Sequence, residues 1–129
     1  MGKETCDRLI RAAVLIDEGL DEHEDNKLKN GIRILDQINP DTLNEGNRGE
    51  LHYYYGNAWW NLWLLHLRAD ARLSWSWTAE EAQRAVFYYR SSLANLSDSP
   101  KDYCRRYQAF INLGNALNTF GRFVEAQRY

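Results

Sequence analysis

Residues 55–59 and 113–117 have the sequences YGNAW and LGNAL, which share a large residue, glycine, asparagine, alanine and a second large residue. Each segment lies in a run of apolar residues at helical spacing, so both glycines are expected inside helices. Glycine in a helix interior costs about 1 kcal/mol relative to alanine. Its recurrence at two equivalent places predicts that a neighbouring helix packs closely against Gly56 and against Gly114. It also favours stacked helical hairpins over a simple bundle.

Periodicity and capping signals extend this pattern over the whole chain of 129 residues. Asp21, the Thr78 capping box and Ser99 before Pro100 are typical helix starts, and Gly19 and Gly121 are expected helix ends. The expected helices span about residues 3–18, 22–38, 48–66, 79–96 and 100–119, and a sixth starts near residue 123. The sequence therefore predicts one all-α domain, residues 1–129, of antiparallel hairpins over about 3–38, 47–96 and 100–129, the last of them truncated.

The glycine pattern resembles the tetratricopeptide repeat, whose first helix carries L-G-x-x-Y and whose second carries A-x-x-x-F/Y. The match is best over residues 110–126 and extends to residues 55–59. The spacing of 58 residues between the two glycines exceeds the usual repeat of about 34, so longer helices and a longer loop around Trp75 and Trp77 are expected. The resemblance implies a short α-solenoid that binds other proteins.

A second resemblance links the motifs at 55–59, 75–77 and 113–126 to the repeat region that precedes a HEPN ribonuclease domain in some bacterial proteins. The HEPN catalytic signature has an arginine and a histidine on one helix with four to six residues between them, and this signature is missing here. Arg48 and His52 have three residues between them. The resemblance thus implies a regulatory segment of an RNA-cleaving protein, with the catalytic part outside this chain.

Composition limits the remaining classes of function. Apolar stretches fall far short of the roughly 20 residues of a membrane-spanning helix, so no membrane association is expected. Cys6 and Cys104 form neither a CxxC pair nor a disulfide framework, which favours the cytoplasm. The histidines have no partner at metal or catalytic spacing. No enzymatic activity, cofactor or metal is therefore predicted.

Charge does not favour nucleic acid as a partner. Residues 1–45 carry 11 acidic and 6 basic side chains, and residues 46–129 carry 7 and 10. The arginines of the basic part fall at scattered helical phases, as on an ordinary solvated surface.

Asparagine is expected on the concave surface of the solenoid, because the residue after each packing glycine faces that way in the repeat. Asn57 and Asn115 occupy this position. A side-chain amide both donates and accepts, so it can bind the backbone of an extended peptide of any sequence. Residues about one turn away, with Trp60 between them, complete the predicted peptide-binding set: Tyr53, Asn57, Trp60, Asn61, Ile111, Asn115 and Asn118. A solvated asparagine-rich face is the alternative.

Of the adjacent tryptophans, Trp59 is expected in the core, while Trp60 or Trp63 faces a neighbour, a ligand or solvent. The truncated last hairpin is expected to expose an apolar strip. Its residues are Phe110, Leu113, Leu117, Phe120 and Phe123. We expect self-association through this strip, most simply as a two-fold homodimer.

Together these patterns predict a non-catalytic module that binds a protein or peptide, as the recognition or scaffold part of a larger bacterial protein or complex. The HEPN-associated, RNA-linked function is the alternative.

Overall fold

The computed structural model describes the backbone of residues 2–69 and 80–127, and the side chains of residues 2–67 and 80–119. These residues form helices and turns, without a strand in the part described. The helices are α1 (Lys3–Asp21), α2 (Asp25–Asp36), the short 3-10 helix η1 (Pro40–Thr42), α3 (Glu45–Ala69), α4 (Glu80–Asn95) and α5 (Pro100–Gln127). The predicted all-α class of helical hairpins is confirmed.

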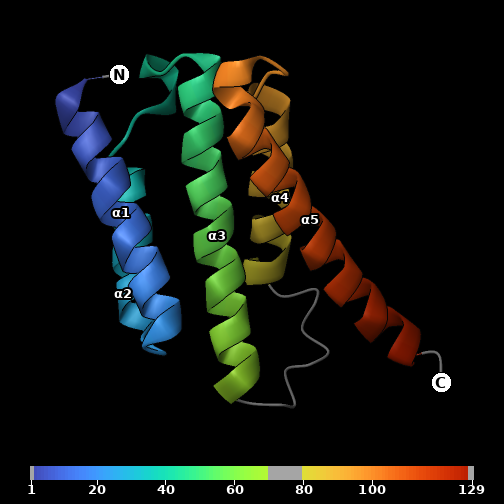
Figure 1. The fold of residues 1–129 in the computed structure, drawn as a ribbon. Helices are drawn as coiled ribbons and strands as arrows, with labels where there is room; N and C mark the ends of the chain where they lie inside the picture. The colour runs from blue at the N-terminus through green and yellow to red at the C-terminus, as the bar shows by residue number, and fades with distance from the viewer. Residues whose placement is uncertain (1, 70–79, 128–129) are drawn as a thin grey trace.

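The helices form two layers (Figure 1). Helices α1, α3 and α5 lie in the front layer and run in the same direction, while α2 and α4 lie behind and run the opposite way. Toward its C-terminal end, α5 diverges from the other helices. The front layer therefore presents a surface with α3 at its centre and α1 and α5 at its sides.

Two cores hold the layers together. The larger core joins α1, α2 and α3 through aliphatic side chains such as Ile16, Leu28 and Leu51, each at most 1% exposed. The smaller core joins α3, α4 and α5 through Tyr53, Ala85, Tyr89 and Ala109. Helix α3 contributes to both cores, which explains why its sequence is apolar on nearly all sides.

The tryptophans of α3 are placed differently from the expectation. Trp63 is the buried one, packed with Ala82 and Ala116 in a third cluster. Trp59 is partly exposed, and the Arg84 guanidinium lies 4.8 Å from its ring centre. Trp59 still packs against both cores from their edge, so the prediction of Trp59 as core holds in part. Helix α3 is covered on two sides, and its sequence alone does not say which indole the two sides enclose.

Glycines allow the helices of each pair to approach closely. A β-carbon at Gly19 would lie 2.8 Å from the Leu28 side chain, and one at Gly31 would lie 3.0 Å from Ile16. Between α3 and α4, a β-carbon at Gly56 would lie 2.6 Å from the Tyr89 ring. The predicted close packing at Gly56 is confirmed.

Gly114 does not have this role. A β-carbon there would have no neighbour within 4 Å. The prediction of close packing at Gly114 was wrong, because no helix of the described part lies over this face of α5. The two matching motifs therefore occupy different environments.

Two expected helix ends were also wrong. Helix α1 continues past Gly19 to Asp21, and His23, with φ 56°, makes the left-handed turn instead. Helix α5 continues through Gly121 to Gln127, so residues 123–127 extend α5 and start no sixth helix. One interior glycine costs only about 1 kcal/mol, which does not end a helix by itself. The Thr78 capping box, Trp75 and Trp77 lie outside the described residues.

The contrast between the two glycines gives a paired prediction. We expect Gly56→Ala to destabilise the fold by about 1–3 kcal/mol, because the added methyl group would overlap the buried Tyr89 ring. We expect Gly114→Ala to stabilise it by about 0.5–1 kcal/mol, since its methyl group meets only solvent. Urea unfolding of both variants measures these changes. Equal effects of the two substitutions would contradict the assignment.

Candidate functional site

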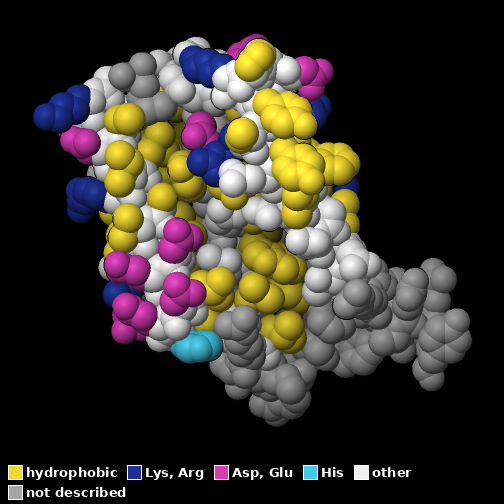
Figure 2. Space-filling model, in the orientation of Figure 1, with side chains coloured by type: hydrophobic (Ala, Val, Ile, Leu, Met, Phe, Trp, Pro, Cys, Tyr) yellow, Lys and Arg dark blue, Asp and Glu magenta, His cyan; other side chains and the backbone are white. Residues whose placement is uncertain are grey.

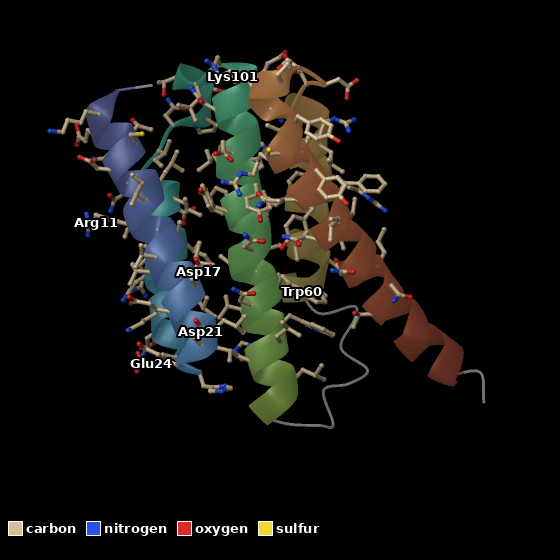
Figure 3. All side chains as sticks on the ribbon, in the orientation of Figure 1. Arg11, Asp17, Asp21, Glu24, Trp60 and Lys101 are labelled. Carbon is tan, nitrogen blue, oxygen red and sulfur yellow. The ribbon has the colours of Figure 1, made fainter. Side chains whose placement is uncertain are left out.

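A polar pocket of about 260 Å3 lies on the face of the front layer, between α1 and α5 and over α3. Helix α4 reaches it from behind through Tyr89. The lining residues are Asp17, Leu20, Asn57, Trp60, Asn61, Tyr89, Asn112 and Asn115. Figure 3 shows Asp17 and Asp21 on α1 and Trp60 on α3, on the face that the front layer turns to the viewer.

Asn57 is the centre of the pocket floor. Its Oδ1 accepts a hydrogen bond from the Tyr89 hydroxyl at 2.6 Å and another from Asn112 Nδ2 at 3.2 Å. Asn112 Nδ2 also lies 3.3 Å from the Tyr53 hydroxyl, to which it donates. Burial raises the pKa of Tyr89 well above its ordinary value, so its hydroxyl stays protonated as a donor. These bonds fix side chains of α3, α4 and α5 in one network.

The other two predicted asparagines of the pocket have unused hydrogen-bonding capacity. Asn61 is 8% exposed, and its Nδ2 donates to the backbone carbonyl of Ile16 at 3.4 Å. Its Oδ1 accepts no hydrogen bond from a described residue. The Asn115 side chain is exposed and makes no hydrogen bond within the described part of the chain. The Asn61 oxygen and the whole Asn115 amide are available to a bound segment.

The wall formed by α1 is acidic. Figure 2 shows acidic side chains gathered over the lower half of α1, and hydrophobic side chains between α3 and α5. Asp17 is the one charged residue among those that line the described pocket. Its partial burial and the nearby carboxylate of Asp21 raise the pKa of Asp17.

Nearer the N-terminal ends of α3 and α5, the same front face carries a basic and an acidic side chain that neutralise each other. Arg105 of α5 forms an ion pair with Glu50 of α3. The Arg105 guanidinium lies 4.3 Å from the centre of the Tyr53 ring, and its Nη2 donates to the Tyr54 hydroxyl at 3.2 Å. This contact joins α3 to α5 and leaves no free cation for the pocket from Arg105.

The structure brings together four of the predicted peptide-binding residues: Asn57, Trp60, Asn61 and Asn115. Tyr53 is 7% exposed and supports Asn112 from below instead of facing a ligand. Ile111 and Asn118 are exposed on α5 but do not line the pocket. The alternative of a solvated asparagine-rich face does not describe Asn57, since its oxygen already accepts two hydrogen bonds within the chain.

Sequence reasoning missed the contributions of other helices. Asp17 and Leu20 come from α1, which lacks the glycine motif, and Tyr89 comes from α4. Asn112 precedes the second motif by one residue. The charged Asp17 and Asp21 at helical spacing were a signal, but their position opposite α3 becomes visible only in the fold.

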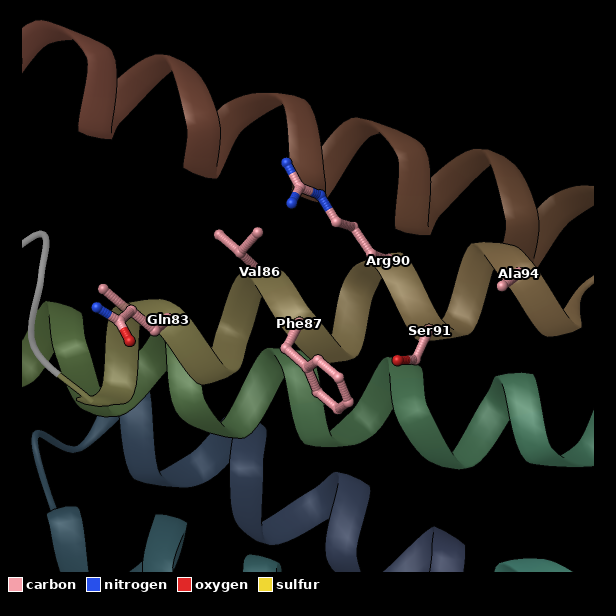
Figure 4. A pocket seen from close by; sticks show the side chains of 7 residues that line it. Gln83, Val86, Phe87, Arg90, Ser91 and Ala94 are labelled. Carbon is pink, nitrogen blue, oxygen red and sulfur yellow. The ribbon is translucent and has the colours of Figure 1, made fainter.

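Another cavity, of about 530 Å3, lies along α4 (Figure 4). Val86 and Arg90 point toward α5 there, while Phe87 points away from it. Phe87 is 62% exposed. This cavity is lined by α4 alone, with Arg90 as its one charged lining residue, and it lacks the convergence of polar groups that the front pocket shows.

The predicted self-association strip is only partly exposed. Phe110 and Leu117 are exposed, but Leu113 packs against the smaller core and was wrongly assigned to the strip. Leu113 lies three residues after Phe110, on the side of α5 that turns toward Tyr53 and Tyr89. The described exposed aromatics of α5 are Tyr103, Tyr107 and Phe110. The side chains of Phe120 and Phe123 lie outside the described part.

Neither a metal cluster nor a membrane span accompanies the pocket in the described part of the chain. Histidine, cysteine, aspartate and glutamate side chains do not gather there in groups of three or more that could hold an ion. None of the described helices combines the length and apolar character needed to cross a bilayer. No protein-family model, curated protein or solved structure matches the chain.

The hydrogen bonds of Asn57 generate a prediction about stability. We expect Asn57→Ala to destabilise the fold by about 1–3 kcal/mol, because the Tyr89 hydroxyl loses its acceptor in a buried place. Asn115→Ala should change stability by less than about 0.5 kcal/mol, since that side chain is exposed. Thermal unfolding compares the two. A loss of stability confined to Asn115→Ala would contradict the assigned network.

Proposed function

We propose that this chain is a non-catalytic interaction domain that binds an extended segment of a partner protein between α1 and α5, over α3. One observation supports the proposal most strongly: a pocket built by four helices and lined by Trp60, in which the Asn61 oxygen and the Asn115 amide have no hydrogen-bond partner among the described residues. Drug-sized ligands occupy pockets of about 300–1,000 Å3. A volume of about 260 Å3 suits one side chain of a longer ligand better.

The layer arrangement supports the tetratricopeptide-like assignment, because three parallel front helices form the candidate binding surface and two back helices support it. The acidic wall favours protein over RNA, since Asp17 and Asp21 would repel the phosphate backbone. Cys6 and Cys104 are both exposed and unpaired, as expected in a reducing compartment. These features support a recognition or scaffold role in a larger cytoplasmic assembly; that the assembly is bacterial is implied by the resemblance alone.

Peptide selection tests this proposed binding groove, the surface between α1 and α5 that contains the pocket, without knowledge of the natural partner. Peptides selected from a random displayed library on the full chain should bind Asn115→Trp at least about tenfold more weakly, because the indole fills the pocket. The matched control is Phe87→Trp, which changes an exposed position on α4 that does not line the pocket. Fluorescence polarisation measures both affinities. Selected peptides that bind both variants like the parent would place the binding surface elsewhere.

We also propose that a second copy covers the exposed aromatic face of α5. Tyr107 and Phe110 are 59% and 63% exposed, so pairing two such faces removes apolar area from water. We expect the parent to be dimeric at high micromolar concentration by light scattering, and Phe110→Glu to be monomeric. A monomeric parent would overturn this proposal and leave the peptide groove untouched.

A further inference from the structure

The C-terminal end of α1 carries two carboxylate pairs, each spaced four residues apart. One pair is Glu18 and Glu22, and the other is Asp17 and Asp21. Adjacent positions on a helix differ by about 100°, so the two pairs face different directions. Like charges four residues apart repel each other, and acids at a helix C-terminus oppose its dipole. Both pairs therefore favour a cation nearby.

The first pair has its cation within the chain. Lys27 of α2 places Nζ 3.2 Å from Glu18 Oε2 and 2.5 Å from Glu22 Oε2. A single ammonium group thus bridges two carboxylates at this spacing. The molecule itself shows the geometry by which a lysine satisfies such a pair.

The second pair has no such cation. Neither Asp17 nor Asp21 forms an ion pair with a described residue. Asp17 lines the front pocket, whose described lining holds no basic side chain. A partly buried carboxylate without a counter-charge is unfavourable, and burial raises the pKa of Asp17 accordingly. The arrangement suits a cation supplied from outside.

The remaining pocket residues fit the stem and head of the same cation. Trp60 and Leu20 offer apolar surface along which a lysine or arginine stem packs. Asn61, 8% exposed, has an Oδ1 that accepts no hydrogen bond from a described residue and is ready for a donor. Ammonium and guanidinium groups are donors only, which matches a pocket rich in carboxylate and amide oxygens.

From this combination of an unpaired carboxylate in the pocket wall, an amide oxygen of Asn61 that accepts no hydrogen bond from a described residue, and apolar flanks, we propose that the pocket takes a lysine or arginine side chain of the bound protein segment. This inference rests on the proposed function and names its specificity. The Glu18–Glu22 pair with Lys27 is the intramolecular counterpart of the contact that the partner makes with Asp17 and Asp21.

The test uses the full chain, labelled with nitrogen-15, and three capped octapeptides in which alanine alternates with lysine, glutamine or glutamate. We expect the lysine peptide to shift the signals of residues 17, 57, 61 and 115 in a saturable way, and the other two peptides to bind at least about fivefold more weakly. An arginine peptide should act like the lysine peptide.

Charge variants then assign the effect to the pocket. The double variant Asp17→Asn, Asp21→Asn should bind the lysine peptide at least about fivefold more weakly than the parent chain. The matched control, Glu18→Gln with Glu22→Gln, removes the same charge from the other face of α1 and should leave the affinity within about twofold. Equal losses in both double variants would overturn the inference, because net charge alone would then explain binding.

The outcomes separate the two proposals. Equal binding of the glutamine and lysine peptides at the pocket would overturn cation recognition and keep the peptide groove. Shifts confined to the outer faces of α4 or α5, or no shift at millimolar peptide, would overturn both. Binding of single-stranded RNA at the pocket in place of peptide would also overturn both.

Discussion

The ring of Tyr89 fills the space beside Gly56, and its hydroxyl donates to Asn57, the next residue along α3. Tyr89 is 1% exposed, so neither the ring nor the hydroxyl has solvent as an alternative. One side chain of α4 thereby sets both the distance to α3 and the orientation of the central amide of the pocket. Through Asn57 and Asn112 the same contact reaches α5. The position of α5, and thus the width of the candidate groove, depends on this contact.

Most of the fold could be predicted from the sequence, because apolar spacing and capping residues are local signals. The α-helical class follows from Leu9, Ala12 and Ile16 in α1 and from similar stripes elsewhere. Helix ends were harder, since Gly19 is used for packing against Leu28 and His23 makes the turn. A glycine can allow a neighbouring helix to pack closely or can allow the chain to reverse direction. Which of these occurs depends on the helix that packs beside it.

The candidate site was predicted only in part, for the same reason. Gly56 and Gly114 have matching neighbours in the sequence, yet Gly56 meets Tyr89 and Gly114 meets solvent. Asn57 and Asn115 differ accordingly: one is a bonded part of the pocket floor, and the other is a free amide at its edge. Asp17 entered the site from a helix without the motif. Contacts between distant segments decide these roles, and a local pattern does not contain them.

Amide hydrogen exchange of Tyr89→Phe most directly tests whether the Tyr89 contact holds α5. The substitution keeps the ring beside Gly56 and removes only the hydroxyl, whose hydrogen bond Asn57 accepts. We expect faster exchange along α5 around residues 109–116, with α1 and α2 protected as in the parent, because the larger core does not involve this bond. Unchanged exchange in α5, or an equal increase in all helices, would contradict the assigned role of Tyr89.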